Sequence, residues 1–218
     1  MILQPPTGER PPDIPLPVYW LASLILWISG WKYAGGLPNV PKMVIIAGPH
    51  TTNWDGFWYL VMTAKMRLRS HVIIKAELVR VPIVGWIFKL FGGIPVERKS
   101  SQNLVEQMVD QFEKRDKLAL VIAPEGTRKH TEFWRAGFYW IAYRAKVPIA
   151  LAVLNYQTKT LGFYGLIEPT GDIQADMQVI GERFAAHAGP KHPERFGPIR
   201  VRIERPPSGI DVGGERAE

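Results

Sequence analysis

Short apolar runs alternate with amphipathic stretches along most of this chain, and that alternation constrains the fold more than any other feature. The runs 43–47, 71–75 and 118–123 are apolar throughout or nearly so, which is typical of strands covered on both faces. Between and after them lie segments with helical spacing of apolar residues, such as 101–112 and 172–187. Strands that alternate with helices predict an α/β fold, a single layered domain with a mostly parallel central sheet flanked by helices.

Composition places the domain boundaries. The chain has 218 residues, which suits one domain with a sizeable core. Residues 1–17 hold six prolines and little apolar pattern, so we predict a disordered or polyproline arm there. The Pro-, Gly- and charge-rich stretch 205–218 predicts a disordered tail. The folded domain is expected to occupy 37–204.

The segment 18–36 opens with an almost continuous apolar run, Val18 to Trp31, rich in tyrosine and tryptophan. Fourteen helical residues span about 21 Å, which is short of a hydrocarbon core roughly 30 Å thick. We therefore predict a membrane-anchor helix that lies in the interface instead of crossing it. An ordinary buried helix is the main alternative. A cleaved signal peptide is disfavoured, because the leading segment is proline-rich and Arg10 is its only base.

The net charge of +7 implies an anionic partner. Between residues 65 and 99 eight basic side chains face only two acidic ones, and Trp86, Phe88 and Phe91 are interleaved with them. An anionic membrane surface explains both the charge and the apolar residues. Nucleic acid is the alternative partner, but no helix-turn-helix, RNP-like or zinc-knuckle pattern is present, so we expect none to bind.

Cysteine is absent from the chain, which excludes disulfides, thiolate nucleophiles and cysteine-bound metals. The histidines outside the stretch described next follow no metal-ligand spacing, so no metal site is expected. They are His71, His130, His187 and His192.

A polar stretch, 47–55, joins the first of the apolar runs to a helical pattern. His50 and Asp55 are separated by four residues across a predicted turn, which allows the carboxylate to fold back against the imidazole. Asp55 would then fix the tautomer of His50, and the other ring nitrogen would take a proton from an alcohol. The helix start would also offer free N–H groups to an anion. The competing interpretation is structural, since Thr52 and Asp55 also fit a capping box.

Two further loops are expected beside this one. The strand predicted at 92–96 ends at Glu97 and Arg98, and the strand at 118–123 leads to Glu125 and Arg128. Since the carboxyl ends of parallel strands meet at one edge of a sheet, these side chains should gather around His50 and Asp55.

With these loops in view, the chain resembles the glycerolipid acyltransferases typified by 1-acylglycerol-3-phosphate (lysophosphatidic acid) acyltransferase. The family's four motifs occur in order between about Met43 and Leu154. They are the HX4D motif from His50 to Asp55, a Gly-x-x-x-x-x-Arg segment at 92–98, Pro-Glu-Gly-Thr-Arg at 124–128, and an apolar strand opened by proline at 147–149. Pro49, Lys129 and Leu151 are among the departures from the family pattern, and they leave the identity of the acceptor open.

The resemblance implies acyl transfer from acyl-CoA or acyl carrier protein, as co-substrate and without a resident cofactor, to the hydroxyl of a lysophospholipid such as 1-acylglycerol-3-phosphate. His50 would be the general base, Asp55 would orient it, and the protein would work at the cytoplasmic face of a membrane. Another lysolipid or an aminolipid acceptor stays open. So do a hydrolase or thioesterase that uses the same pair, and a membrane-binding module whose loops are only structural.

The same resemblance implies six substrate-binding residues. They are Lys75, Arg98, Glu125, Gly126, Thr127 and Arg128. Arg98 would hold the acceptor's phosphate through paired hydrogen bonds, with Arg128 assisting and Lys75 as a further phosphate ligand. Glu125 and Gly126 would bind the glycerol end.

Overall fold

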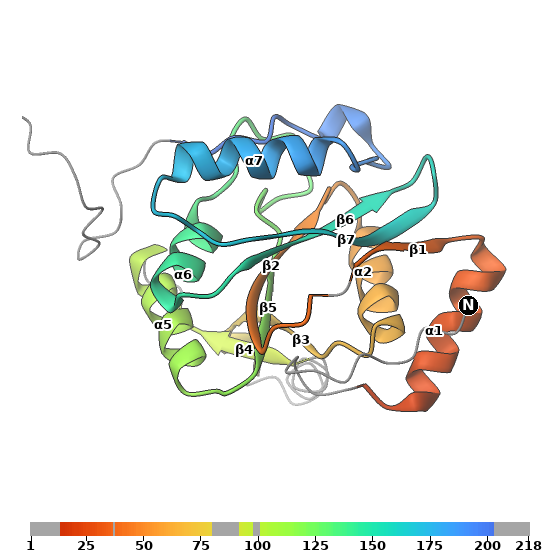
Figure 1. Ribbon diagram of the computed structural model, residues 1–218, viewed down its shortest axis with the longest axis horizontal. Coiled ribbons are helices and arrows are strands. Elements are labelled where there is room, and N and C mark those ends of the chain that lie inside the picture. The colour runs from red at the N-terminus through yellow and green to blue at the C-terminus, as the bar shows by residue number, and fades with distance from the viewer. Residues whose placement is uncertain (1–13, 37, 80–91, 98–100, 203–218) are drawn as a thin grey trace, which may run out of the picture.

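A seven-stranded sheet forms the middle layer of the computed structural model, which describes residues 14–36, 38–79, 92–97 and 101–202. The strand order is β1-β7-β6-β2-β5-β3-β4 (Figure 1). In chain order the strands are β1 (Lys32–Gly35), β2 (Lys42–Gly48), β3 (Ser70–Lys75), β4 (Gly93–Val96), β5 (Leu118–Ile122), β6 (Ile149–Asn155) and β7 (Thr160–Ile167). The predicted α/β domain with a mostly parallel sheet is confirmed.

Helices cover both faces of the sheet (Figure 1). They are α1 (Leu16–Ser29), α2 (Asn53–Lys65), the single turn α3 (Ala76–Val79), α5 (Ser101–Glu113), α6 (Gly137–Ala145) and α7 (Ile173–Ala185), with a short 3₁₀ turn at Pro193–Arg195. The helices α5, α6 and α7 share one apolar core with one face of the sheet, and α1 and α2 share a second core with the other face. The domain therefore has three layers.

Strand β2 lies at the centre of this arrangement. Val44 and Ile46 belong to the α5–α7 core, whereas Met43 and Ile45 belong to the α1–α2 core, and all four are fully buried. This is the alternation that a strand covered on both faces requires, and it explains why the run at 43–47 contains no polar residue.

Five strands run in the same direction and so end at one edge of the sheet. β2 pairs in parallel with β5 and β6, and β3 pairs in parallel with β5 and β4. β7 is antiparallel to β6, and β1 runs parallel to β7. The chain therefore leaves β2, β4, β5 and β6 on the same side, where the loops of three of the motifs begin.

Two sequence predictions differ from the structure at the ends of the domain. The helix expected within 18–36 spans Leu16–Ser29, and Lys32–Gly35 forms the edge strand β1 after Gly30 ends the helix in the left-handed conformation (φ 72°). The alternation of apolar and charged residues at 199–204 predicts an edge strand, but in its described part the structure has a single bridge between Val201 and Trp134.

Other predictions concern residues that the structure describes only in part. The part of the basic segment that contains Trp86, Phe88 and Phe91 lies outside the described residues, as do most of the N-terminal arm and the whole C-terminal tail. Within the described ranges, no helix has the length and apolar character needed to cross a membrane.

Candidate active site

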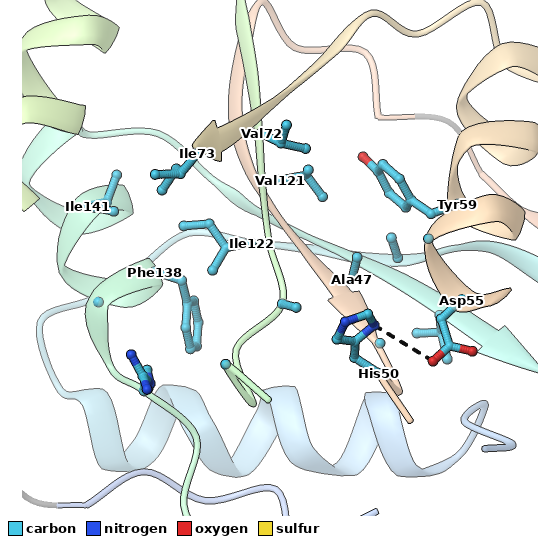
Figure 2. A pocket seen from close by; sticks show the side chains of 18 of the residues that line it. Ala47, His50, Asp55, Tyr59, Val72, Ile73, Val121, Ile122, Phe138 and Ile141 are labelled. Carbon is cyan, nitrogen blue, oxygen red and sulfur yellow. Dashed lines mark ion pairs between the residues drawn. The ribbon is translucent and has the colours of Figure 1, made fainter. Parts of the chain in front are cut away.

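The end of β2 and the start of α2 bring His50 and Asp55 together, as the sequence predicts. His50 lies two residues beyond β2, and Asp55 lies in the first turn of α2. The Nδ1 atom of His50 is 3.7 Å from Oδ2 of Asp55, and the two side chains lie at one end of a cavity (Figure 2). This distance is longer than that of an N–H···O hydrogen bond, which spans about 2.7–3.2 Å, and the contact is an ion pair only when His50 is protonated. Contacts between catalytic groups often shorten to that range only when substrate binds.

Asp55 also caps α2, so the capping box that the sequence allows is present together with the contact to His50. Its Oδ2 accepts hydrogen bonds from the N–H groups of Thr51 (2.6 Å) and Thr52 (2.7 Å). The hydroxyl of Thr52 in turn accepts from the Trp54 N–H (3.4 Å), which completes a capping box. The helix cap thereby holds the carboxylate at the position from which it faces His50.

Glu125 supports the other side of the turn. Its Oε1 accepts a hydrogen bond from the His50 N–H (3.0 Å), while Oε2 has no partner in the described part of the chain. The side chain is buried, and loss of hydration raises the pKa of Glu125 to about 7. Gly48 makes room for it, because a Cβ there would lie 3.2 Å from Oε1 and 2.9 Å from Phe184.

The electrostatic environment of His50 favours the neutral imidazole. Burial is the largest effect and lowers the pKa of His50 below its ordinary value, the nearby Asp55 raises it, and Arg128 lowers it further. A neutral imidazole is the form that accepts a proton. His50 therefore has the protonation state that a general base needs near neutral pH.

An apolar cavity of about 840 Å³ extends from this pair across the ends of the strands. Figure 2 shows Val72, Ile73, Val121, Ile122 and Ile141 beyond His50 and Asp55. Helices α2, α5 and α6 complete the walls. Such a cavity, mostly apolar with a few polar side chains in its walls, fits a ligand with an alkyl chain and a reactive polar group.

The structure brings some of the predicted substrate residues to this site. Gly126 lines the cavity with His50, and its φ of 64° is a left-handed conformation that favours glycine. Arg128 is exposed and acts on the His50 imidazole electrostatically. Lys75 is exposed at the carboxyl end of β3, on the same edge of the sheet.

Two of the predicted residues, Thr127 and Arg98, remain. The Thr127 hydroxyl accepts a hydrogen bond from the Lys129 N–H (3.2 Å), so its recorded contact is within its own loop. Arg98 lies outside the described residues. Among the described residues no group of three or more His, Asp or Glu side chains is arranged to hold a metal ion.

Three residues at the site are not among those that the sequence predicts. Tyr156, just beyond β6, donates its hydroxyl to Oδ1 of Asp55 (2.7 Å). Arg135 lines the cavity beside Gly126, where a Cβ would lie 2.6 Å from its Nε. Arg195 donates to the Thr51 carbonyl (3.2 Å). Only Tyr156 has a sequence signal, because it directly follows an apolar strand whose carboxyl end belongs at this edge.

The backbone at the start of α2 differs from expectation in one respect. The N–H groups of His50, Thr51, Thr52 and Trp54 all donate hydrogen bonds within the protein. They are therefore committed to the turn and the cap, and the expectation that this helix start offers free N–H groups to an anion is not supported at these four positions.

The fold and the site together define an α/β domain with a histidine–carboxylate pair at the mouth of an apolar cavity. The family model described as Acyltransferase matches residues 35–154, which is more than half of the chain. This chain therefore belongs to the acyltransferase family, as its motifs predict.

Individual relatives agree with this assignment. The chain is 35% identical over 137 residues to a probable 1-acyl-sn-glycerol-3-phosphate acyltransferase 5 of Arabidopsis thaliana, a match that covers 61% of this chain and 36% of the relative. It is 28% identical over 193 residues to the 1-acyl-sn-glycerol-3-phosphate acyltransferase of Pseudomonas aeruginosa, a match that covers 85% of this chain and 70% of the relative. The corresponding Streptococcus pneumoniae enzyme is 30% identical, over 59% of this chain and 49% of that protein. The chain thus spans half or less of the Arabidopsis and Streptococcus proteins.

A solved structure has the same fold. The crystal structure of the 1-acyl-sn-glycerophosphate (LPA) acyltransferase PlsC from Thermotoga maritima superposes with a TM-score of 0.52 at 14% identity. The similarity covers 78% of this chain and 77% of that one.

Proposed function

We propose that this chain is a membrane-associated O-acyltransferase that moves a fatty acyl group from an acyl thioester to the hydroxyl of a lysophospholipid, with 1-acylglycerol-3-phosphate as the acceptor. The observation that carries the proposal is the position of His50, 3.7 Å from Asp55 at one end of an apolar cavity. Burial, which lowers the pKa of His50, supports its role as a base. The names of the relatives support the choice of acceptor. The donor is acyl-CoA or acyl carrier protein, and no resident cofactor is proposed.

In the proposed reaction the acceptor hydroxyl attacks the thioester carbonyl directly. His50 takes the hydroxyl proton as the new C–O bond forms, while Asp55 stabilises the imidazolium. The tetrahedral intermediate then collapses, the C–S bond breaks, and His50 returns the proton to the departing thiolate. No covalent enzyme intermediate is required. General-base help is worth about 10²–10⁴-fold, so positioning in the cavity supplies a large further share of the rate enhancement.

Cations around the pair would hold the acceptor's phosphate. Arg128 acts on the His50 imidazole from the loop after β5, and Lys75 ends β3 at the same edge. By family resemblance Arg98 is the principal phosphate ligand, with Glu125 and Gly126 at the glycerol end. Arginine forms the planar, paired hydrogen bonds that suit phosphate oxygens.

The N-terminal helices support association with a membrane, and the cytoplasmic face is proposed from the family resemblance alone. Apolar side chains are exposed along one side of α1 and the adjoining part of α2, and we call this surface the α1–α2 apolar face. Its residues are Leu16, Val18, Trp20, Leu21, Leu24, Trp27, Ile28, Trp54, Phe57 and Leu60. Lys65 joins the two helices by donating to Ser23 Oγ (2.9 Å) and Tyr19 OH (3.2 Å). Exposed apolar side chains on neighbouring helices, tryptophans among them, are typical of an interfacial anchor.

The catalytic role of the His50–Asp55 pair is tested by replacing either residue with alanine and measuring thioester consumption with acceptor present. We expect His50→Ala to lower kcat by about 10²–10⁴-fold, since general-base help of that size is lost. His187→Ala is the matched control, because His187 is exposed and stacks on Tyr164 beyond α7. Near wild-type turnover by folded His50→Ala would remove the assignment.

The reaction class is tested by identifying the products with and without lysolipid, using one labelled acyl thioester and a panel of acceptors. A transferase stalls without acceptor and forms a diacyl lipid with it. Release of free fatty acid at an acceptor-independent rate would identify a thioesterase instead. Vesicle binding without any thioester turnover would identify a membrane-binding module.

A further inference from the structure

Tyr156 occupies a position that none of the family motifs includes. It follows β6 directly, and β6 lies beside β2 with Val153 paired to Gly48. The end of β6 therefore reaches the same edge of the sheet as His50. The Tyr156 hydroxyl donates to Oδ1 of Asp55 at 2.7 Å, a short hydrogen bond to a buried carboxylate.

The hydrogen bonds to Asp55 divide unequally between its two oxygens. Both backbone donors, Thr51 N–H and Thr52 N–H, bind Oδ2, which is also the oxygen nearest His50. Donors on a single oxygen fix that atom but leave the carboxylate plane free to turn about it. Tyr156 binds the other oxygen and supplies the second point of attachment.

We propose that Tyr156 is a positioning residue for the acyl-transfer reaction, which holds the Asp55 carboxylate in the orientation that serves His50. This inference rests on the proposed function, because it assigns Tyr156 its role through the His50–Asp55 pair. Tyr156 acts on Asp55 and makes no recorded contact with His50.

The surroundings of Tyr156 keep its ring in place. Its edge packs on Trp31 with ring centroids 5.1 Å apart, and Trp31 stacks on Trp58 of α2 at 4.3 Å. The backbone N–H of Tyr156 donates to the Gly189 carbonyl (2.8 Å), and Lys191 Nζ lies 6.0 Å from the ring centroid. Burial, followed by the neighbouring Asp55, raises the pKa of the Tyr156 hydroxyl above its ordinary value. The phenol therefore remains a donor throughout the working pH range.

The hydroxyl also sets how strongly Asp55 acts on His50. Among the described residues, the charged groups that influence the imidazole are Asp55, which raises its pKa, and Arg128, which lowers it. Glu125 binds the backbone N–H of the same residue. The Tyr156 O–H dipole offsets part of the carboxylate charge. Removing it should strengthen the effect of Asp55 and raise the pKa of His50.

The test compares Tyr156→Phe with Tyr139→Phe. Phenylalanine keeps the ring packing on Trp31 and removes only the oxygen. Tyr139 is a matched control, because its hydroxyl donates to another buried aspartate, Asp176, at the same distance of 2.7 Å and within the α5–α7 core. His50→Ala is measured alongside as the reference for loss of the pair.

For Tyr156→Phe we expect kcat to fall about 10- to 100-fold, the range typical of losing a partner that orients a catalytic group, with the acceptor KM little changed. The acid limb of the kcat/KM profile should move to higher pH, because His50 with a raised pKa becomes neutral only at a higher pH. Tyr139→Phe should change neither quantity, although it loses an equivalent hydrogen bond to Asp176 and also the acceptor of the Gly171 N–H (2.9 Å).

The outcomes separate the two proposals. Wild-type kcat and an unmoved pH profile in Tyr156→Phe, with His50→Ala inactive, would overturn the role of Tyr156 and leave the proposed function standing. A fall in kcat with an unmoved profile would identify a merely structural effect and would also overturn it. An active His50→Ala would instead show that the pair itself is not catalytic.

Discussion

At the scale of single residues, Glu125 has an unusual combination of properties. One oxygen holds the His50 backbone, the other has no partner among the described residues, and the side chain is only 6% exposed. Burial raises the pKa of this carboxyl from 4.5 to about 7. The folded protein therefore binds the Glu125 proton more tightly than the unfolded chain does. The contribution of Glu125 to the free energy of unfolding is therefore full below about pH 4.5 and is lost as the pH rises from there through 7.

Glu125→Gln should abolish this dependence, because glutamine does not ionise and keeps an oxygen that accepts from the His50 N–H. Relative to wild type, we expect the variant to gain about 2–3 kcal/mol in free energy of unfolding between pH 5 and pH 8. Urea denaturation at the two pH values measures the difference. Glu182→Gln, an exposed carboxyl on α7, is the control and should show none. Parallel pH profiles for wild type and Glu125→Gln would contradict the prediction.

At the scale of elements, the first turn of α2 combines a structural and a chemical role in one carboxylate. Because Asp55 accepts from Thr51 and Thr52, its removal costs helix stability as well as the partner of His50. The activity of Asp55→Ala therefore needs to be compared with that of a variant that weakens the cap alone.

Thr52→Ala provides that comparison. It removes the hydroxyl that accepts from the Trp54 N–H but leaves the backbone donors and Tyr156 on Asp55. We expect a loss of about 1 kcal/mol in free energy of unfolding with kcat close to wild type. Asp172→Ala is matched to it, since Asp172 caps α7 by accepting from Gln174 and Ala175 N–H groups far from the pair in sequence. If Thr52→Ala lost turnover as fully as Asp55→Ala, the cap and the chemistry would not be separable.

The elements also differ in how well the sequence predicts them. The buried strands β2 and β5 and the helices α5 and α7 were predictable, because burial on both faces or on one helical face leaves a periodic pattern. The meeting of His50, Asp55 and Glu125 followed from parallel strands ending at one edge. Tyr156 was missed because its position after an apolar strand does not identify its partner, and the hydrogen bond to Asp55 spans 101 residues. Strand β1 was missed because Lys32–Gly35 pairs with β7, a partner fixed only by the tertiary fold.

At the scale of the whole molecule, the helices on the two sides of the sheet differ in how much apolar surface they expose. The side covered by α5, α6 and α7 buries most of its large apolar residues, whereas α1 and α2 expose the α1–α2 apolar face. Trp27, Ile28 and Trp20 are the most exposed there, with 79%, 71% and 62% of their surface exposed. A chain of net charge +7 that carries such a face should bind anionic vesicles by two additive terms, one apolar and one electrostatic.

Replacing Trp20 and Trp27 by aspartate tests the apolar term. Each tryptophan withdrawn from the interface should weaken partitioning onto phosphatidylglycerol-containing vesicles by about tenfold or more, given roughly 1.5–3 kcal/mol per buried apolar side chain. Folding should be retained, because neither side chain belongs to a core cluster. Val179→Asp on α7, an exposed apolar residue on the other side of the sheet, is the control for added charge.

Cosedimentation at rising salt separates the two terms, since screening weakens only the electrostatic one. Wild-type partitioning by the double variant would show that this face does not meet the membrane, and the route by which a lipid acceptor reaches His50 would then have to lie elsewhere.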